Sequence, residues 1–319
     1  MARIYTPITL TNSQSQATPS NFQQLIQTAL LYPNGVRFWS PTDGWLHAWL
    51  ESISSGTATI WLKIPSSIPA NGTYQLYIIQ DSTLPMNGVY WGEAPQLSST
   101  YAQYDNGANV FNNYWNFAGT SLPSSLTAEG TTSNIAINNG ITFSGSSDAL
   151  VRSTNAIPYP QIADALIQTS TSADYPSAVI GESTTTTMID NAYGWLQNGY
   201  AWDYYGGAWR LEYITTNNAR NIVGYVTANM VAGDVYSIVW VAVGNEKTYI
   251  NYISQVNAVD TTISSIGNYY AYLGFDTSST SSYTAQWLRT RAYPPNGIMP
   301  TASFGASQYS GELITVTVP

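Results

Sequence analysis

Residues 202–212 read WDYYGGAWRLE, with two adjacent glycines, Gly206 and Gly207, between two runs of aromatic and apolar side chains. Adjacent glycines favour the two-residue turn of a β-hairpin, because glycine adopts positive φ angles without strain. In such a hairpin, residues that oppose one another across the turn form side-chain pairs on a shared face. The predicted pairs are Tyr204–Trp209, Trp202–Leu211 and Asp203–Arg210.

The same pattern of short runs and turn signals extends along the chain. Between the turns lie β-branched and aromatic runs, and in Thr57–Lys63 the alternation predicts a core face of Ala58, Ile60 and Leu62. Phe22–Leu30 has apolar residues at helical spacing, although a strand fits nearly as well. The Asn-Gly turn signals begin at Asn34, Asn71, Asn87, Asn106, Asn139, Asn198 and Asn296, and Asp43-Gly44 adds another. This density predicts an all-β fold of sandwiches or barrels.

The chain is long enough for two domains, each with its own core. It has 319 residues, and periodicity is lost near residues 93–105, where small and polar residues replace the alternating pattern. We therefore predict two β-sandwich domains, at 1–95 and 106–308. Residues 309–319 form a C-terminal tail that reads as a further strand.

The composition excludes several classes of partner. Only 8% of residues are charged, against roughly 25% in an average protein, and the net charge is −9. Without a basic cluster, nucleic acid is not an expected partner. The sequence has no Cys, and no apolar run is long enough to span a bilayer. The first residues lack the apolar core of a signal peptide, so we expect either a leader outside the given sequence or another route of release, such as lysis.

Residues 1–80 resemble an uncharacterised domain family of archaeal surface proteins. The resemblance is carried by PITLTN at 7–12, by WLE at 49–51, by IWLKIP at 60–65 and by IPANGT at 68–73. In such proteins a concanavalin A-like, laminin-G-like jelly roll often follows, and WNFAGTSL at 115–122 with WLRTRAYPPNG at 287–297 is similar to its first and last parts. The resemblance implies a jelly-roll second domain, an extracellular location, and an archaeal or archaeal-virus origin.

Concanavalin A-like folds include glycoside hydrolases, so the resemblance raises the question of catalytic carboxyl groups. Hydrolysis of a glycosidic bond needs two carboxyl groups close together, and the best pair is Asp203 with Glu212. We expect the hairpin to place them on opposite faces. His47 is the only histidine, so neither a Ser-His-Asp relay nor a zinc site on imidazoles can be assembled. The sequence therefore predicts a protein that is not an enzyme.

No cofactor is predicted, and calcium stays open as a ligand. Calcium takes carboxylate, amide and carbonyl oxygens from loops. Asp105-Asn106 and Asp276-Thr277 supply such groups, although no Asp-x-Asp-x-Asp-Gly loop is present.

Aromatic side chains offer one candidate ligand site. Trp202, Tyr204 and Trp209 could stack on the flat faces of sugars. The alternative is that these rings fill the core of the jelly roll. The sequence leaves both interpretations open, together with glycosylation at the sequon Asn71-Gly72-Thr73.

The end of the chain suggests assembly. In residues 312–319, two alternating sets of side chains form a strand that could complete a sheet in a neighbouring copy; the assembly residues are Leu313, Ile314, Thr315, Val316, Thr317 and Val318. Arg3–Thr11 is the rival donor strand. We predict a structural subunit of a filament on a cell or virion surface, joined by strand exchange into a homopolymer. The alternative is a carbohydrate-binding adhesion module.

Overall fold

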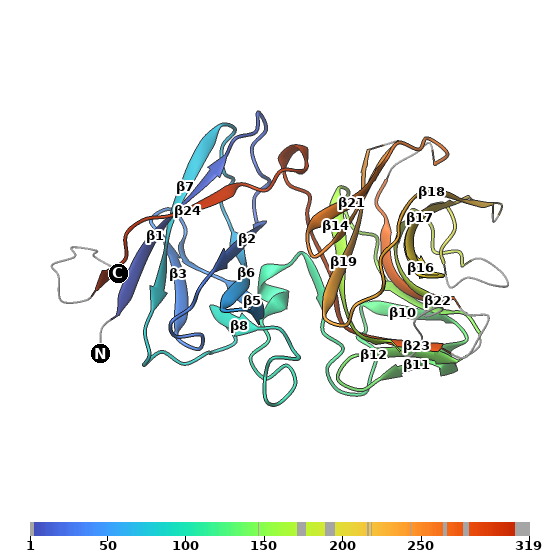
Figure 1. Ribbon diagram of the computed structural model, residues 1–319, viewed down its shortest axis with the longest axis horizontal. Helices are drawn as coiled ribbons and strands as arrows, with labels where there is room; N and C mark the ends of the chain where they lie inside the picture. Colours follow the sequence, from blue (N-terminus) through green and yellow to red (C-terminus); the bar gives the residue numbers. More distant parts are fainter. Residues whose placement is uncertain are drawn as a thin grey trace. The chain divides into compact units, whose positions relative to one another are not determined.

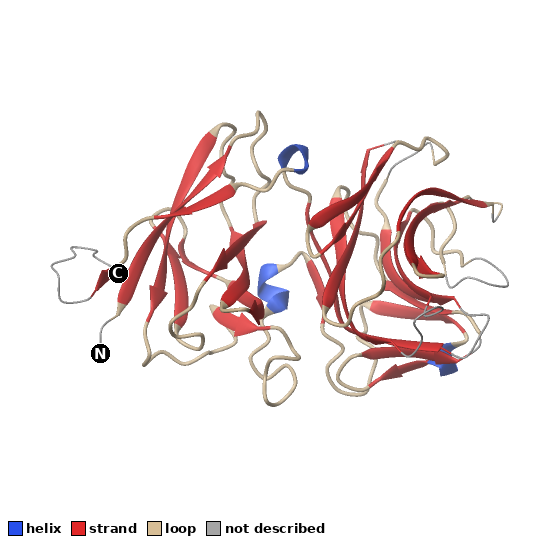
Figure 2. Ribbon diagram, in the orientation of Figure 1, coloured by secondary structure: helices blue, strands red, loops and turns tan. Residues whose placement is uncertain are grey.

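A computed structural model describes residues 3–145, 147–170, 177–188, 195–215, 217, 219–242, 244–263, 267–276 and 281–309. The chain divides into two compact units: unit 1 is Met1–Asn112 with Pro294–Pro319, and unit 2 is Asn113–Tyr293. Both units are built almost wholly from strands (Figure 2). The predicted boundaries at 95, 106 and 308 differ from these, because the chain returns to unit 1 after unit 2.

Unit 1 is a sandwich of two sheets. Sheet A has the strand order β24-β1-β7-β3-β4, with β25 also paired to β1, and sheet B has the order β2-β6-β5-β8 (Figure 1). The elements are β1 Ile4–Asn12, β2 Phe22–Thr28, β3 Val36–Ser40, β4 Gly44–Leu46, β5 Ala48–Ser54, β6 Thr57–Ile64, β7 Gly72–Gln80, β8 Trp91–Glu93, α1 Gly107–Val110, η2 Pro295–Gly297, β24 Thr301–Phe304 and β25 Gln308–Tyr309.

The alternation of the sequence builds the core of unit 1. In β1, Ile8 and Leu10 face the core and are buried, while Pro7 and Thr9, which alternate with them, face outward. The predicted core face of Ala58, Ile60 and Leu62 in β6 is confirmed. The helical prediction for Phe22–Leu30 is wrong: residues 22–28 form strand β2, because they pair along β6 from Phe22 opposite Ile64 to Thr28 opposite Ala58.

Unit 2 is a larger sandwich of two antiparallel sheets. Sheet C has the order β11-β12-β23-β14-β19-β20-β21 with β9 beside β23, and sheet D has the order β10-β13-β22-β15-β16-β17-β18. The elements are β9 Asn113–Trp115, β10 Leu126–Gly130, η1 Thr132–Asn134, β11 Ile135–Ile137, β12 Ile141–Gly145, β13 Ala149–Ser153, β14 Gln161–Ser170, β15 Ser177–Ser183, β16 Gly199–Tyr205, β17 Ala208–Ile214, β18 Arg220–Val226, β19 Asp234–Ala242, β20 Asn245–Ile250, β21 Ile253–Ala258, β22 Tyr270–Asp276 and β23 Ser281–Ala292.

The hairpin of β16 and β17 has the register that its two glycines predict. Gly206 and Gly207 both adopt positive φ, at 60° and 76°. Their flanking residues form the three predicted pairs, Tyr204–Trp209, Asp203–Arg210 and Trp202–Leu211. The predicted all-β fold class is confirmed, and each of the two units is a β-sandwich.

Candidate functional site

The hairpin of β3 and β4 places two tryptophans on the outer face of sheet A. Val36 and Phe38 of β3 are buried in the core of unit 1. Trp39 follows Phe38, and because side chains alternate along a strand it faces away from the core. Trp39 lies directly opposite Trp45 across the hairpin. The turn is fixed by Asp43, whose carboxylate accepts hydrogen bonds from the Tyr74 hydroxyl at 2.7 Å and the Ser66 hydroxyl at 2.6 Å.

Tyr77 of β7 extends this arrangement by one strand. It lies opposite Trp39, and the two ring centroids are 6.0 Å apart with planes inclined at 40°. Neighbouring strands are about 4.8 Å apart, so Trp45, Trp39 and Tyr77 form a row about 10 Å long across three strands. Trp45 is 39% exposed, and Trp39 and Tyr77 are half-buried. We call these three residues the aromatic row.

The polar groups that border the aromatic row are either uncharged or buried. Gln75 lies two residues before Tyr77 on the same outward face and is exposed. Its side-chain oxygen accepts a hydrogen bond from the Thr9 hydroxyl at 2.9 Å, which directs its amide oxygen toward Thr9 and leaves amide N–H groups to donate elsewhere. Arg37, two residues before Trp39, is buried and donates to the carbonyl oxygens of Val36 and Pro85, so its guanidinium is largely hidden from solvent. The surface is therefore suited to a neutral ligand with flat apolar faces and hydroxyl groups.

A second candidate lies on the outer face of sheet D. Asp203 pairs with Arg210, and Ala201 pairs with Glu212. Directly opposed residues project to the same side, as do residues two apart in one strand. Asp203 and Glu212 therefore share one face, about 7–8 Å apart along the diagonal, and our prediction of opposite faces is wrong. The hairpin register was predicted correctly, but the sides of the two carboxylates were not.

Other side chains cover this acid pair. Asp203 and Glu212 are each 3% exposed. Trp195 and Leu196 are fully buried in a small apolar cluster with Ala201 and Tyr272 on the same side of the sheet. Burial raises the pKa of Glu212, and the charges of Arg220 and Arg210 oppose that rise. The pair has the chemistry of an acid and a base, but it lies beneath apolar side chains in this structure.

The predicted sugar-stacking residues lie in the core of unit 2. Trp202, Tyr204 and Trp209 are at most 1% exposed. The Trp209 ring lies 4.0 Å from that of Tyr236 and 5.5 Å from that of Trp202, measured between centroids. Of the two interpretations that the sequence leaves open, this placement favours the one in which the rings fill the core: Trp202 and Tyr204 on β16, and Trp209 opposite Tyr204 on β17, face the other sheet.

Other residues singled out in the sequence have structural partners or lie outside the description. His47 contacts the Val89 carbonyl oxygen through Nδ1 at 2.8 Å and stacks on Tyr90. Asp105 accepts hydrogen bonds from the Trp49 indole at 2.8 Å and the Gly107 amide at 3.0 Å. In the described part of the chain, no three His, Asp or Glu side chains are grouped to hold a metal ion. Thr277, the Asp276 side chain and the assembly residues Leu313, Ile314, Thr315, Val316, Thr317 and Val318 lie outside the described residues.

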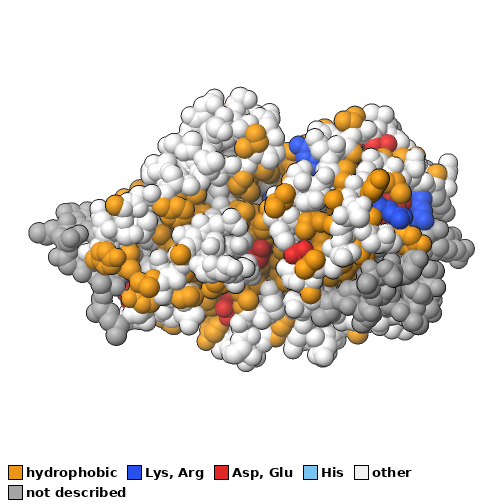
Figure 3. Space-filling view, viewed as in Figure 1, with side chains coloured by type: hydrophobic (Ala, Val, Ile, Leu, Met, Phe, Trp, Pro, Cys, Tyr) orange, Lys and Arg blue, Asp and Glu red, His pale blue; other side chains and the backbone are white. Residues whose placement is uncertain are grey.

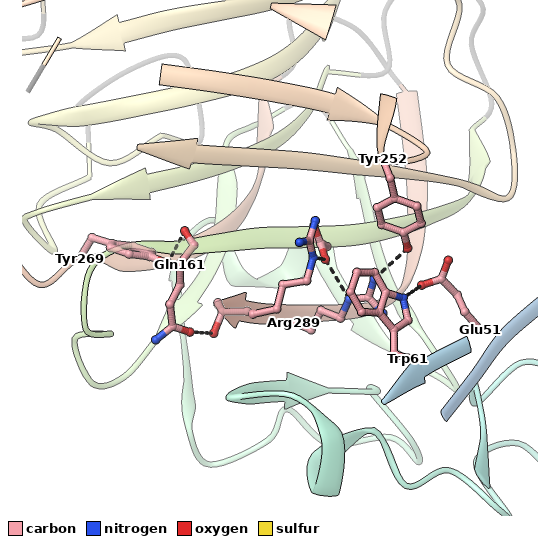
Figure 4. Close-up of polar contacts among 9 residues, drawn as sticks. Glu51, Trp61, Gln161, Tyr252, Tyr269 and Arg289 are labelled. Carbon is pink, nitrogen blue, oxygen red and sulfur yellow. Dashed lines mark hydrogen bonds and ion pairs between the residues drawn. The ribbon is translucent and has the colours of Figure 1, made fainter. Parts of the chain in front are cut away.

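Unit 2 also contains a buried ionic network, on β14 and β23. Asp164 accepts hydrogen bonds from Arg289 at 2.9 Å and Arg291 at 2.7 Å, and all three side chains are at most 4% exposed. Arg289 also donates to the Tyr252 hydroxyl at 2.8 Å (Figure 4). Burial alone would raise the pKa of Asp164, but the two arginines lower it overall. The two cations share one carboxylate, which makes Asp164 the residue on which the network depends.

Comparison with known proteins gives one relative in sequence. An uncharacterized protein of Sulfolobus islandicus rod-shaped virus 1 is 39% identical over 136 residues, which cover 39% of this chain. The matched part is 24% of the viral protein, so the chain spans about a quarter of the relative's length. No protein-family model matches the chain. The archaeal-virus part of the resemblance is thus supported, and the surface-protein family is not.

Comparison with solved structures gives similarities to proteins that act on or bind carbohydrate. An endo-β-1,3-glucanase from Pyrococcus furiosus has a TM-score of 0.45 and 10% identity, covering 57% of this chain and 94% of that one. A family 16 endo-glucanase from Bacteroides ovatus has a TM-score of 0.41 and 10% identity over 56% and 99%. The carbohydrate binding module CBM66 from Bacillus subtilis has a TM-score of 0.38 and 14% identity over 53% and 96%. At these identities and TM-scores we base no activity on the similarity.

These similarities do correct one prediction. We expected a protein that is not an enzyme, yet the similar structures include family 16 glycoside hydrolases. One argument for that prediction was that Asp203 and Glu212 lie on opposite faces, and the register of β16 and β17 removes it.

Proposed function

We propose that this chain binds carbohydrate through the aromatic row on the outer face of sheet A. The observation that carries the proposal is the alignment of Trp45, Trp39 and Tyr77 on adjacent strands, with their rings partly open to solvent. Three rings on adjacent strands offer a row of apolar faces to successive sugar units. Gln75 beside them can donate hydrogen bonds to hydroxyl groups.

The ligand that fits this surface is a neutral glycan. None of the four side chains is charged, and acidic sugars would find no exposed cation among them. Charged side chains are also sparse on the face of the protein drawn in Figure 3. Within the described residues, no helix is long and apolar enough to cross a bilayer. The setting we propose is a cell or virion surface, where an adhesion module meets surface polysaccharides.

The test is a glycan array, followed by titration with the best ligand. Covering roughly 50 Å² of apolar ring surface contributes about 1.3 kcal/mol, and about 1.4 kcal/mol changes a dissociation constant tenfold. We therefore expect Trp45→Ala and Trp39→Ala each to weaken binding about tenfold. Circular dichroism and thermal melting establish that each variant remains folded.

Tyr225→Ala is the matched control. Tyr225 is 67% exposed on β18 of unit 2, and its removal should leave glycan affinity unchanged. The proposal is wrong if no neutral glycan is bound, or if the two tryptophan variants bind as well as the natural protein does. Assembly into a filament through residues 312–319 stays a separate prediction.

A further inference from the structure

The C-terminal strands complete sheet A from the far end of the chain. β24 pairs with β1 from Thr301 opposite Thr11 to Phe304 opposite Ile8, and β25 places Tyr309 opposite Ile4. Figure 1 shows β24, in red, beside β1, in blue. The whole of unit 2 separates these segments in sequence. The strands at this edge of sheet A, β24 and β25, therefore come from the C-terminal end of the chain, whereas their partner β1 comes from the N-terminal end.

These strands are held mainly through their backbone. Phe304 is 41% exposed and Tyr309 is 53% exposed, and Thr301 and Ser303 are exposed as well. Of the residues in β24 and β25, Ala302 is the one that packs against the core of unit 1. Segments with few buried apolar contacts and an exposed backbone open more readily than interior strands do.

β1 is held by β7 as well as by β24. It pairs with β7 along its whole length, from Ile4 opposite Gln80 to Asn12 opposite Gly72. When β24 leaves, the other edge of β1 presents unpaired N–H and C=O groups, which are a template for an added strand. At Pro7 this edge favours a strand that carries glycine. The Gly305 amide donates to the Pro7 carbonyl oxygen at 2.9 Å, and a Cβ on residue 305 would lie 2.7 Å from the Pro7 ring.

The connector to β24 is short and stiff. It runs from the end of β23 at Ala292 to Thr301 and contains Pro294, Pro295 and Pro300. The Pro300 carbonyl oxygen accepts a hydrogen bond from the Gln24 side chain at 2.9 Å, a contact with unit 1 that either copy can supply. Short hinge loops under strain invite exchange between copies, whereas stiffness opposes it, so exchange is favoured here by the weakly held edge strands and not by the prolines.

We propose that residues 301–309 of one copy pair with β1 of a second copy of this chain. Every contact of β24 and β25 with β1 is reproduced in such an exchange, because the donor and acceptor have the same sequences as before. A reciprocal exchange closes a dimer, and a one-way exchange continues into a polymer. If the aromatic row binds glycans as proposed above, either assembly carries several rows and gains avidity.

The test uses single cysteines in a chain that has none. Thr9 lies opposite Ser303 in the β1–β24 pair. Opposed residues in antiparallel strands have Cα atoms about 4.5–5.5 Å apart, within the range that a disulfide spans. Thr9→Cys and Ser303→Cys chains with different affinity tags are co-expressed and oxidised. We expect a covalent dimer that carries both tags, with a disulfide between positions 9 and 303 found by peptide mass spectrometry.

Co-expression of Thr9→Cys with Tyr225→Cys measures random collision, since Tyr225 is exposed but does not pair with β1. The proposal is overturned if the mixed dimer does not exceed this background while the double variant Thr9→Cys/Ser303→Cys forms its disulfide within a monomer. The readout involves no glycan, so its failure is distinct from failure of the proposed binding.

Discussion

Replacing Glu246 by Gln should change how the stability of unit 2 depends on pH. Glu246 lies on β20, fully buried, close to Tyr200 and Asp260. Tyr200 donates a hydrogen bond to the Asp260 carboxylate at 2.9 Å. Burial raises the pKa of Glu246 to about 7 from an ordinary value of 4.5, and the nearby charge of Asp260 adds to the rise.

The direction of the effect follows from proton linkage. A carboxyl group with a raised pKa holds its proton more tightly in the folded state, so the free energy of unfolding falls as pH rises from about 4.5 toward 7. The difference between the two pKa values corresponds to roughly 3 kcal/mol. Asp260 beside it is only half-buried, so water screens the site, and we reduce the expected loss to about 2 kcal/mol.

The assay is urea unfolding at about pH 5 and about pH 8. The natural protein should lose about 2 kcal/mol more than Glu246→Gln across this interval, because the amide has no proton to lose. Glu129→Gln removes a partly exposed carboxylate paired with Arg152 and should keep the natural pH dependence. Parallel pH dependence in the natural protein and Glu246→Gln would refute the reasoning.

Two further substitutions separate buried charge from core packing, and both are measured by urea unfolding. Asp164→Ala leaves the guanidinium groups of Arg289 and Arg291 buried without their shared carboxylate, and we expect a loss of about 3–5 kcal/mol; a loss below about 1 kcal/mol would contradict the proposed dependence of the network on Asp164. Trp209→Ala opens a cavity against Tyr236 and Trp202 and should cost about 3–5 kcal/mol, whereas Trp45→Ala, at a partly exposed position, should cost far less. Equal losses for Trp209→Ala and Trp45→Ala would contradict the assignment of one ring to the core and the other to the surface.

The turn residues predicted the strand register of the β16–β17 hairpin correctly, but they did not predict which face of the hairpin is exposed to solvent. The two glycines at 206 and 207 fix the register of β16 and β17, because a two-residue loop permits one pairing of its strands. The aromatic row depends on a different loop. Asp43-Gly44 suggests a two-residue turn, but Trp39 opposite Trp45 and Ser40 opposite Gly44 show a three-residue loop at 41–43. A two-residue turn at 43–44 would place Thr42 opposite Trp45, so the position and length of this loop decide that Trp39 lies there.

By itself, the sequence determined the strands, the turns and the alternation of side chains along each strand, because these depend on neighbouring residues. The tertiary structure decided which face of each strand is covered: the rings of Trp202 and Trp209 lie between two sheets, while those of Trp39 and Trp45 lie on an outer face. It also decided that residues 301–309 return to β1. Both outcomes depend on long-range pairing between segments, and no local pattern contains that information because a period of two fits either face equally well.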